Sequence, residues 1–74
     1  MNAVQARALF LRTLMERVRE DRYPSATQMT MIEQALPPQL LPEFIEILLE
    51  KVAEDRNPSI PMLQRISRLV DAAR

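Results

Sequence analysis

The sequence contains no cysteine, no glycine and no histidine, and each absence excludes a kind of chemistry. A chain without cysteine forms no disulfide bond and offers no thiolate to a metal ion or a substrate. A chain without histidine lacks the commonest general base, and a chain without glycine lacks the loops that hold phosphate groups. We therefore expect no catalytic, cofactor-binding or metal-binding residues. The lack of cysteine also fits a cytoplasmic location.

An excess of one charge and a long apolar run are missing as well. Ten Lys and Arg side chains balance ten Asp and Glu side chains, so the formal net charge is zero. Nucleic-acid-binding proteins are typically basic, and this balance argues against that function. No apolar segment approaches the ~20 residues that cross a bilayer, so no membrane segment is predicted. Aromatic residues make up only 4% of the chain, and the composition favours helices over strands.

A repeated segment organises what is present. Residues 20–25, EDRYPS, return as residues 54–59, EDRNPS, after 34 positions. The similarity extends over residues 10–36 and 44–70, in which 10 of 27 positions are identical. An internal repeat indicates a supersecondary unit that is used more than once. Tetratricopeptide arrays have the same period, but this chain lacks the glycine of that pattern and has only two copies, so we exclude that family.

The spacing of apolar residues predicts four helices. They cover about residues 3–20, 25–36, 41–54 and 59–73, with a short turn at 38–41. Prolines at positions 24, 37, 38 and 58 stop the helices in a chain that has no glycine caps. The side chains expected to be buried are Val4, Ala8, Leu11, Leu14, Met15, Val18, Ala26, Met29, Ile32, Leu36, Leu41, Ile45, Leu48, Leu49, Val52, Leu63, Ile66 and Val70.

The repeated segments, residues 20–25 and 54–59, are here called the elbows. They are short connections between helices, and such connections produce antiparallel hairpins. The sequence therefore predicts an all-α fold, a compact four-helix domain of residues 1–74, made of two repeated αα-hairpins. Repeat 1 covers about 3–36, the linker 37–41 and repeat 2 about 42–73. Two hairpins with one sequence pattern are expected to be related by approximate two-fold pseudo-symmetry. Equivalent residues should then be equally buried: Leu14 and Leu48, Val18 and Val52, and Ile32 and Ile66.

The elbows carry serines and charged pairs. Ser25 and Ser59 follow Pro24 and Pro58, where each serine can cap the next helix, and Gln28 would complete a capping box with Ser25. The charged pairs are Asp21 with Arg22 and Asp55 with Arg56. They are either a doubled binding motif or local structure, because each aspartate lies at the unfavourable end of a helix and can turn toward free N–H groups or the adjacent arginine.

Two further features have functional interpretations. Glutamates spaced four apart, at positions 16 and 20 and at 46, 50 and 54, could bind a divalent ion or simply face solvent. On the third helix, Leu40 and Ile47 point away from the side that carries the residues expected to be buried, and Phe44 lies between these two sides. Their first-repeat counterparts are Ala6 and Thr13, so the hairpin does not require bulk there. Leu40, Phe44 and Ile47 are therefore either a partner surface or part of a wide core, and we expect them to form the interface through which the chain self-associates.

We expect a non-enzymatic module for protein–protein interaction, which binds a protein partner or associates with itself as a homodimer. Self-association would help a chain too short to build a large core. The alternative is a small nucleic-acid-associated regulator that uses basic residues of the first and last helices, namely Arg7, Arg12, Arg17, Arg65 and Arg68.

Overall fold

The computed structural model describes all 74 residues, and every regular element in it is helical. The elements in chain order are α1 (Ala3–Glu20), α2 (Ala26–Ala35), a 3₁₀ turn η1 (Pro38–Leu40), α3 (Leu41–Glu54) and α4 (Ile60–Ala72). The all-α class, the four helices and the turn are confirmed, with bounds within one or two residues of those predicted. Pro38 opens η1, and Pro42 and Pro61 lie in the first turns of α3 and α4, where a missing N–H costs nothing.

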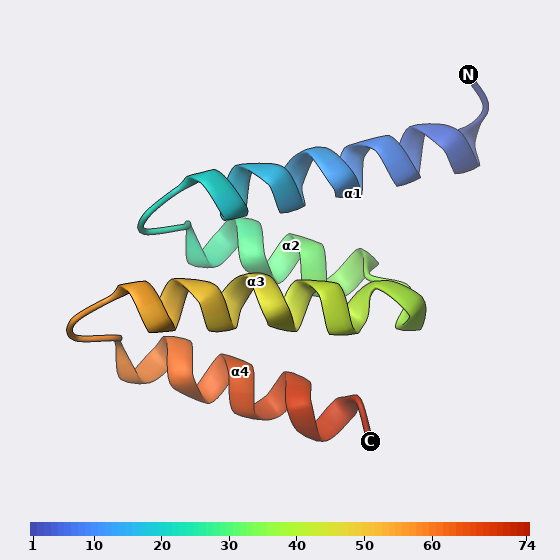
Figure 1. The fold of residues 1–74 in the computed structure, drawn as a ribbon. Helices are drawn as coiled ribbons and strands as arrows, with labels where there is room; N and C mark the ends of the chain where they lie inside the picture. Colours follow the sequence, from blue (N-terminus) through green and yellow to red (C-terminus); the bar gives the residue numbers. More distant parts are fainter. The chain divides into compact units, whose positions relative to one another are not determined.

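The chain divides into two compact units, Met1–Leu36 and Pro37–Arg74. The first is a hairpin of α1 and α2, here called hairpin 1, and the second is a hairpin of α3 and α4 preceded by η1, here called hairpin 2 (Figure 1). The division falls at the start of the predicted linker. That the hairpins form one domain with two-fold pseudo-symmetry stays a prediction.

The two elbows have the same backbone geometry. Asp21 and Asp55 end α1 and α3 in extended conformations, with φ and ψ of −76° and 131° and of −90° and 130°. No residue of the chain has a positive φ, so both helices end without the left-handed cap that glycine would supply. Instead the Asp21 N–H donates to the Arg17 carbonyl over 3.0 Å, and the Asp55 N–H donates to the Lys51 carbonyl over 3.1 Å.

Side-chain caps begin three of the four helices. Ser25 Oγ accepts the Gln28 N–H over 3.3 Å, and Ser59 Oγ accepts the Met62 N–H over 3.2 Å, which confirms both predicted N-caps. The predicted capping box at α2 is wrong, because the Gln28 side-chain oxygen is buried without a hydrogen-bond partner. A complete box lies at α1 instead, where the Asn2 and Gln5 side chains each accept the other's backbone N–H over 2.8 and 3.0 Å.

Removing either serine cap is expected to destabilise the protein. Ser25→Ala and Ser59→Ala should each lower the free energy of unfolding by about 1 kcal/mol, because one N–H at the start of the following helix loses its acceptor. Urea denaturation followed by circular dichroism measures this loss. Ser67→Ala is the matched control, since Ser67 is exposed in the interior of α4 and caps nothing. An equal loss in all three variants would contradict the cap assignment.

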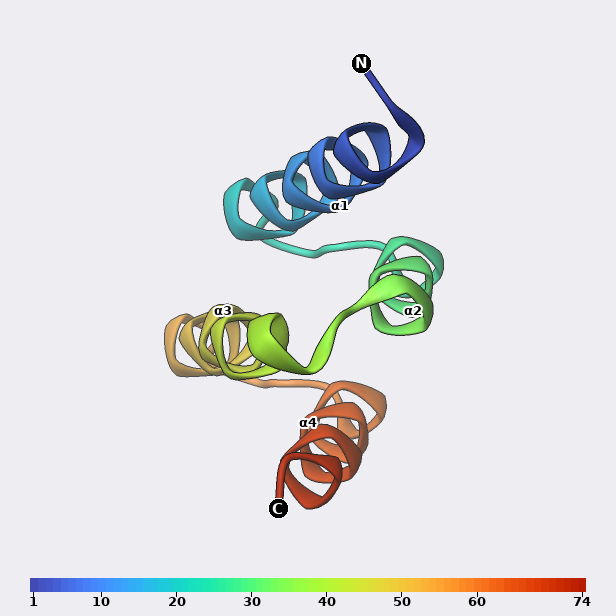
Figure 2. The same ribbon diagram turned by 90° about the vertical axis from the view of Figure 1, so that its right-hand side faces the viewer.

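The two helices of hairpin 1 differ greatly in length, whereas those of hairpin 2 differ by one residue. With 18 residues α1 is about 27 Å long, whereas α2 has 10 residues and is about 15 Å long. The N-terminal half of α1 therefore extends past the end of α2 (Figure 1). Every residue before Leu11 is exposed, including Val4, which was expected to be buried. In hairpin 2, α3 and α4 have 14 and 13 residues and lie side by side (Figures 1 and 2).

The core is less symmetric than the repeat predicts. Ile32 and Ile66 are both buried, but Leu14 and Val52 are only half-buried although Leu48 and Val18 are fully buried. Equal burial is therefore wrong for two of the three pairs. On α3 the covered arc runs from Ile47 through Leu48 to Ile45, about 160° at ~100° per residue, whereas the arc on α1 is about 100° wide. The buried set is Leu11, Met15, Val18, Met29, Ile32, Phe44, Ile47, Leu48, Ile66 and Leu69.

Candidate functional site

The interior offers no reactive group. No polar or charged residue is buried, and no three acidic side chains lie close enough together to hold a metal ion. The glutamates of α1 and α3 are exposed, and Glu16 makes a surface ion pair with Arg19 at 3.7 Å. Exposed pairs of this kind contribute little to stability. Both elbow serines are occupied as helix caps.

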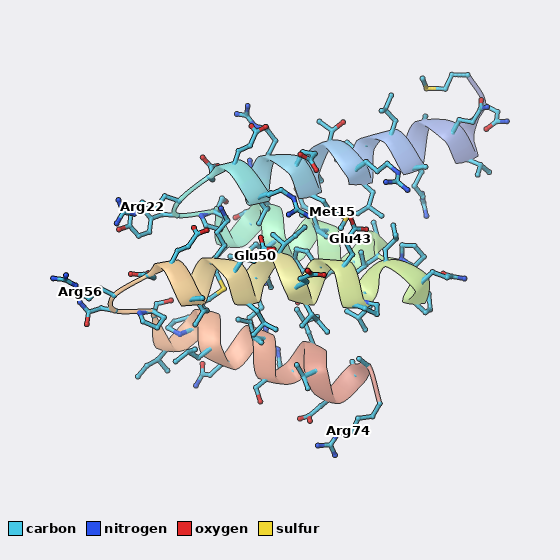
Figure 3. The ribbon with its side chains drawn as sticks, viewed as in Figure 1. Met15, Arg22, Glu43, Glu50, Arg56 and Arg74 are labelled. Atoms are coloured by element: carbon cyan, nitrogen blue, oxygen red, sulfur yellow. The ribbon has the colours of Figure 1, made fainter.

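The charged pairs of the elbows lie at the tips of the hairpins, where Arg22 and Arg56 point away from the helices (Figure 3). The two elbows use their polar groups differently. Asp55 Oδ1 accepts the N–H of Asn57 over 3.1 Å, which stabilises the turn rather than the start of the next helix. The Arg22 guanidinium lies 5.6 Å from the centre of the Tyr23 ring, a cation–π contact. The cation–π contact depends on Tyr23, whose place in the second elbow is taken by Asn57, whereas the Asp55 bond is made to a backbone N–H.

The arginines of α1 that the alternative hypothesis uses are not gathered on one side of that helix. At ~100° per residue, Arg7, Arg12 and Arg17 lie about 80–140° apart around α1. On α4, Arg65 is half-buried, and desolvation together with the nearby Arg68 charge lowers the pKa of its guanidinium. Nucleic acids are bound by basic groups gathered on one surface. The spread of the three arginines around α1 therefore gives no support to that function.

The predicted partner surface on α3 is not exposed. Phe44 and Ile47 have 0% and 1% of their surface accessible, and Leu40 is half-buried. Phe44, Ile47 and Leu48 have the spacing i, i+3, i+4 and so share one side of the helix. The expectation that Leu40, Phe44 and Ile47 form an outer patch is thus corrected, since the wide-core alternative describes these side chains.

Apolar side chains are exposed elsewhere on hairpin 2. Leu49 of α3 and Leu63 of α4 are 48% and 43% exposed, and Val70 is as exposed as Leu63. Each lies about 40–60° past the edge of the covered arc of its helix, in the same rotational sense. In an antiparallel pair the same sense places residues on the same side, so Leu49, Leu63 and Val70 share one side of hairpin 2. We call these three side chains the Leu63 face.

A second exposed set lies on hairpin 1. Phe10 of α1 is 49% exposed, and Met31 of α2 is 41% exposed. Both lie about 40° before the start of the covered arc of their helix, whereas the residues of the Leu63 face lie past its end. Phe10 and Met31 therefore share one side of hairpin 1, and this side is the opposite side of the hairpin motif from that of the Leu63 face. We call this pair the Phe10 face. It is smaller than the Leu63 face and lies beside Arg17, which follows Phe10 by two helical turns.

Sequence reasoning missed both faces, because helical periodicity assigns Leu49, Leu63 and Val70 to the core stripe. It also missed Leu69, which is buried although its first-repeat counterpart is Ala35. The signal that could have found Leu69 is its spacing of three residues from Ile66 on the same side of α4. Periodicity finds the apolar side of a helix, but it does not say how much of that side is covered.

No helix of the chain combines the length and the apolar character that a membrane crossing requires. Comparisons with protein-family models, with curated proteins and with solved structures gave no match to this chain.

Proposed function

We propose that this protein is a non-enzymatic module for protein–protein interaction, built from a duplicated helical hairpin. The observation that carries the proposal is the Leu63 face. Three large aliphatic side chains, each between two-fifths and half exposed, lie together on one side of hairpin 2. Clustered exposed apolar side chains on a soluble helical unit are typical of a surface that binds a partner.

The chemistry of the chain supports the same conclusion. It has no histidine or cysteine, no buried polar side chain and no acidic cluster that could hold a metal. Binding through an apolar helical face needs none of these groups, because burial of apolar area drives it.

Photo-crosslinking tests the proposal. A benzophenone amino acid at position 63 is expected to form an adduct with a protein partner in an extract of the native cells, and untagged wild-type protein should compete with that adduct. Where the captured protein is not this chain, untagged Leu63→Glu protein should not compete, because a carboxylate at the centre of the face cannot be buried without a partner. We expect at least a tenfold difference in competitor concentration between the two.

Position 9 provides the matched control. Leu9 is 53% exposed on α1 but lies outside both faces, and its repeat equivalent is Glu43, so Leu9→Glu should compete as well as wild type. If position 63 forms no adduct, or if Leu63→Glu competes equally well for an adduct with a protein other than this chain, the Leu63 face is not a binding surface. Salt-sensitive binding to duplex DNA, lost on removing Arg12 and Arg17, would instead support the nucleic-acid alternative.

A further inference from the structure

Three pairs of equivalent residues differ in exposure, because one member of each pair is buried and the other is exposed. Met15 and Met29 of hairpin 1 are each 4% exposed, whereas their equivalents Leu49 and Leu63 are the exposed centre of the Leu63 face. The reverse holds for the phenylalanines, because Phe44 is fully buried and Phe10 is half exposed. One side of the hairpin motif is therefore covered in hairpin 1 and open in hairpin 2, and the other side is open in hairpin 1 and covered in hairpin 2.

These two open sides differ in kind. The Leu63 face belongs to the side on which the motif carries Met15 or Leu49 and Met29 or Leu63. The Phe10 face belongs to the side on which it carries Phe10 or Phe44. The first side is apolar in both repeats, and the second carries a phenylalanine in both, although Arg65 stands at the position of Met31. Apolar sides are the property that lets repeated units stack on one another. A molecule with one open side of each kind can bind a copy of itself through unlike surfaces.

Charge favours unlike pairing over like pairing. The helix that carries Phe10 has four arginines and two glutamates, and Arg17 lies next to Phe10 on its side. The helix that carries Leu49 has four glutamates and one lysine, and Glu46 is exposed one turn before Leu49. Two Leu63 faces would bring acidic α3 helices together, and two Phe10 faces would bring basic α1 helices together.

We propose that the Leu63 face of one copy binds the Phe10 face of a second copy, so that the chain associates head to tail. This inference rests on the proposed function, of which it names the partner. An interface between unlike surfaces leaves one face free at each end, so association continues beyond the dimer unless the chain of copies closes into a ring. The mass of the wild-type protein should therefore rise with concentration past that of a dimer.

Mixing two single variants tests the unlike pairing. Phe10→Glu keeps an intact Leu63 face, and Leu63→Glu keeps an intact Phe10 face; each substitution replaces a side chain that is more than two-fifths exposed, so both variants should remain folded. Alone, each should sediment as a monomer at concentrations where the wild type is assembled. An equimolar mixture should give a dimer that contains one copy of each and that does not grow further.

Analytical ultracentrifugation separates the outcomes, with Leu9→Glu as a control that should assemble as the wild type does. A mixture that stays monomeric, or a wild type that is monomeric at several hundred micromolar, overturns head-to-tail association. A Phe10→Glu variant that still dimerises while Leu63→Glu does not overturns it in favour of a symmetric Leu63 interface. In each case the adduct at position 63 decides the proposed function separately, because a partner other than this chain would still be captured there and still resist competition by Leu63→Glu.

Discussion

Phe44→Ala is expected to lower the free energy of unfolding by about 3–5 kcal/mol, whereas Phe10→Ala should lower it by about 1 kcal/mol or less. Both variants remove the same side chain from the same position of the repeat. The difference follows from burial, because Phe44 is fully enclosed and Phe10 is about half exposed. Removing the enclosed ring leaves a cavity and loses its contacts, while Phe10 loses only partial cover.

The consequence of Phe44→Ala is large for a chain of this length. A stability of about 0.05–0.15 kcal/mol per residue gives a 74-residue protein only about 4–11 kcal/mol in total. Thermal denaturation followed by circular dichroism at low micromolar concentration should show a midpoint at least about 8 °C lower for Phe44→Ala than for Phe10→Ala. Equal shifts in the two variants would mean that the repeat is symmetric in solution and that the two faces are not distinct.

The sequence predicts the local structure of this protein well, and the reason lies in its helix boundaries. Pro24 and Pro58 restrict the residue before them to extended conformations, and Ser25 and Ser59 then accept the first free N–H groups of the next helix. These effects act over a few residues, so reading the chain locally is enough to find them. Asn2 and Gln5 form a cap of the same kind, which the spacing of their side chains could also have revealed.

Exposure could not be predicted in the same way, because it depends on what covers each helix. Val4 continues the apolar stripe of α1 but is 78% exposed, since α2 ends before it reaches that level. Leu63 and Val70 have the spacing of core residues and are exposed, while Leu69, at an unpredicted position, is buried. A repeat also makes equivalent positions alike in sequence without making them alike in environment, as Phe10 and Phe44 illustrate.

The candidate surface on α3 was wrong for the same reason, because its exposure could not be predicted from the sequence. With Leu40, Phe44 and Ile47, α3 carries more apolar area than α1 does, since the counterparts of these residues in α1 include alanine and threonine. Whether such extra apolar area meets a partner chain or the chain's own core is a question of tertiary packing. Phe44 and Ile47 are buried, and the exposed apolar side chains are Leu49, Leu63 and Val70, on another side of hairpin 2.

Ile47→Glu is expected to abolish the fold, with loss of the helical signal at any protein concentration. Ile47 is 1% exposed and every residue of the buried core is apolar, so a carboxylate there would lose its hydration without gaining a partner. Burial of an unpaired charge costs several kcal/mol, which is of the same order as the whole stability of a chain this long. Far-ultraviolet circular dichroism and the dispersion of amide resonances measure the loss directly.

Thr13→Glu is the matched control, because Thr13 is the repeat equivalent of Ile47 and is exposed on α1. Its hydroxyl donates only to the Leu9 carbonyl of its own helix, over 2.8 Å, and glutamate favours helix more than threonine does, so the variant should stay folded. If Ile47 were instead at the centre of an interface between chains, Ile47→Glu would give a stable helical monomer. A folded Ile47→Glu protein that sediments as a monomer would therefore contradict the burial of α3 and return the binding surface to Leu40, Phe44 and Ile47.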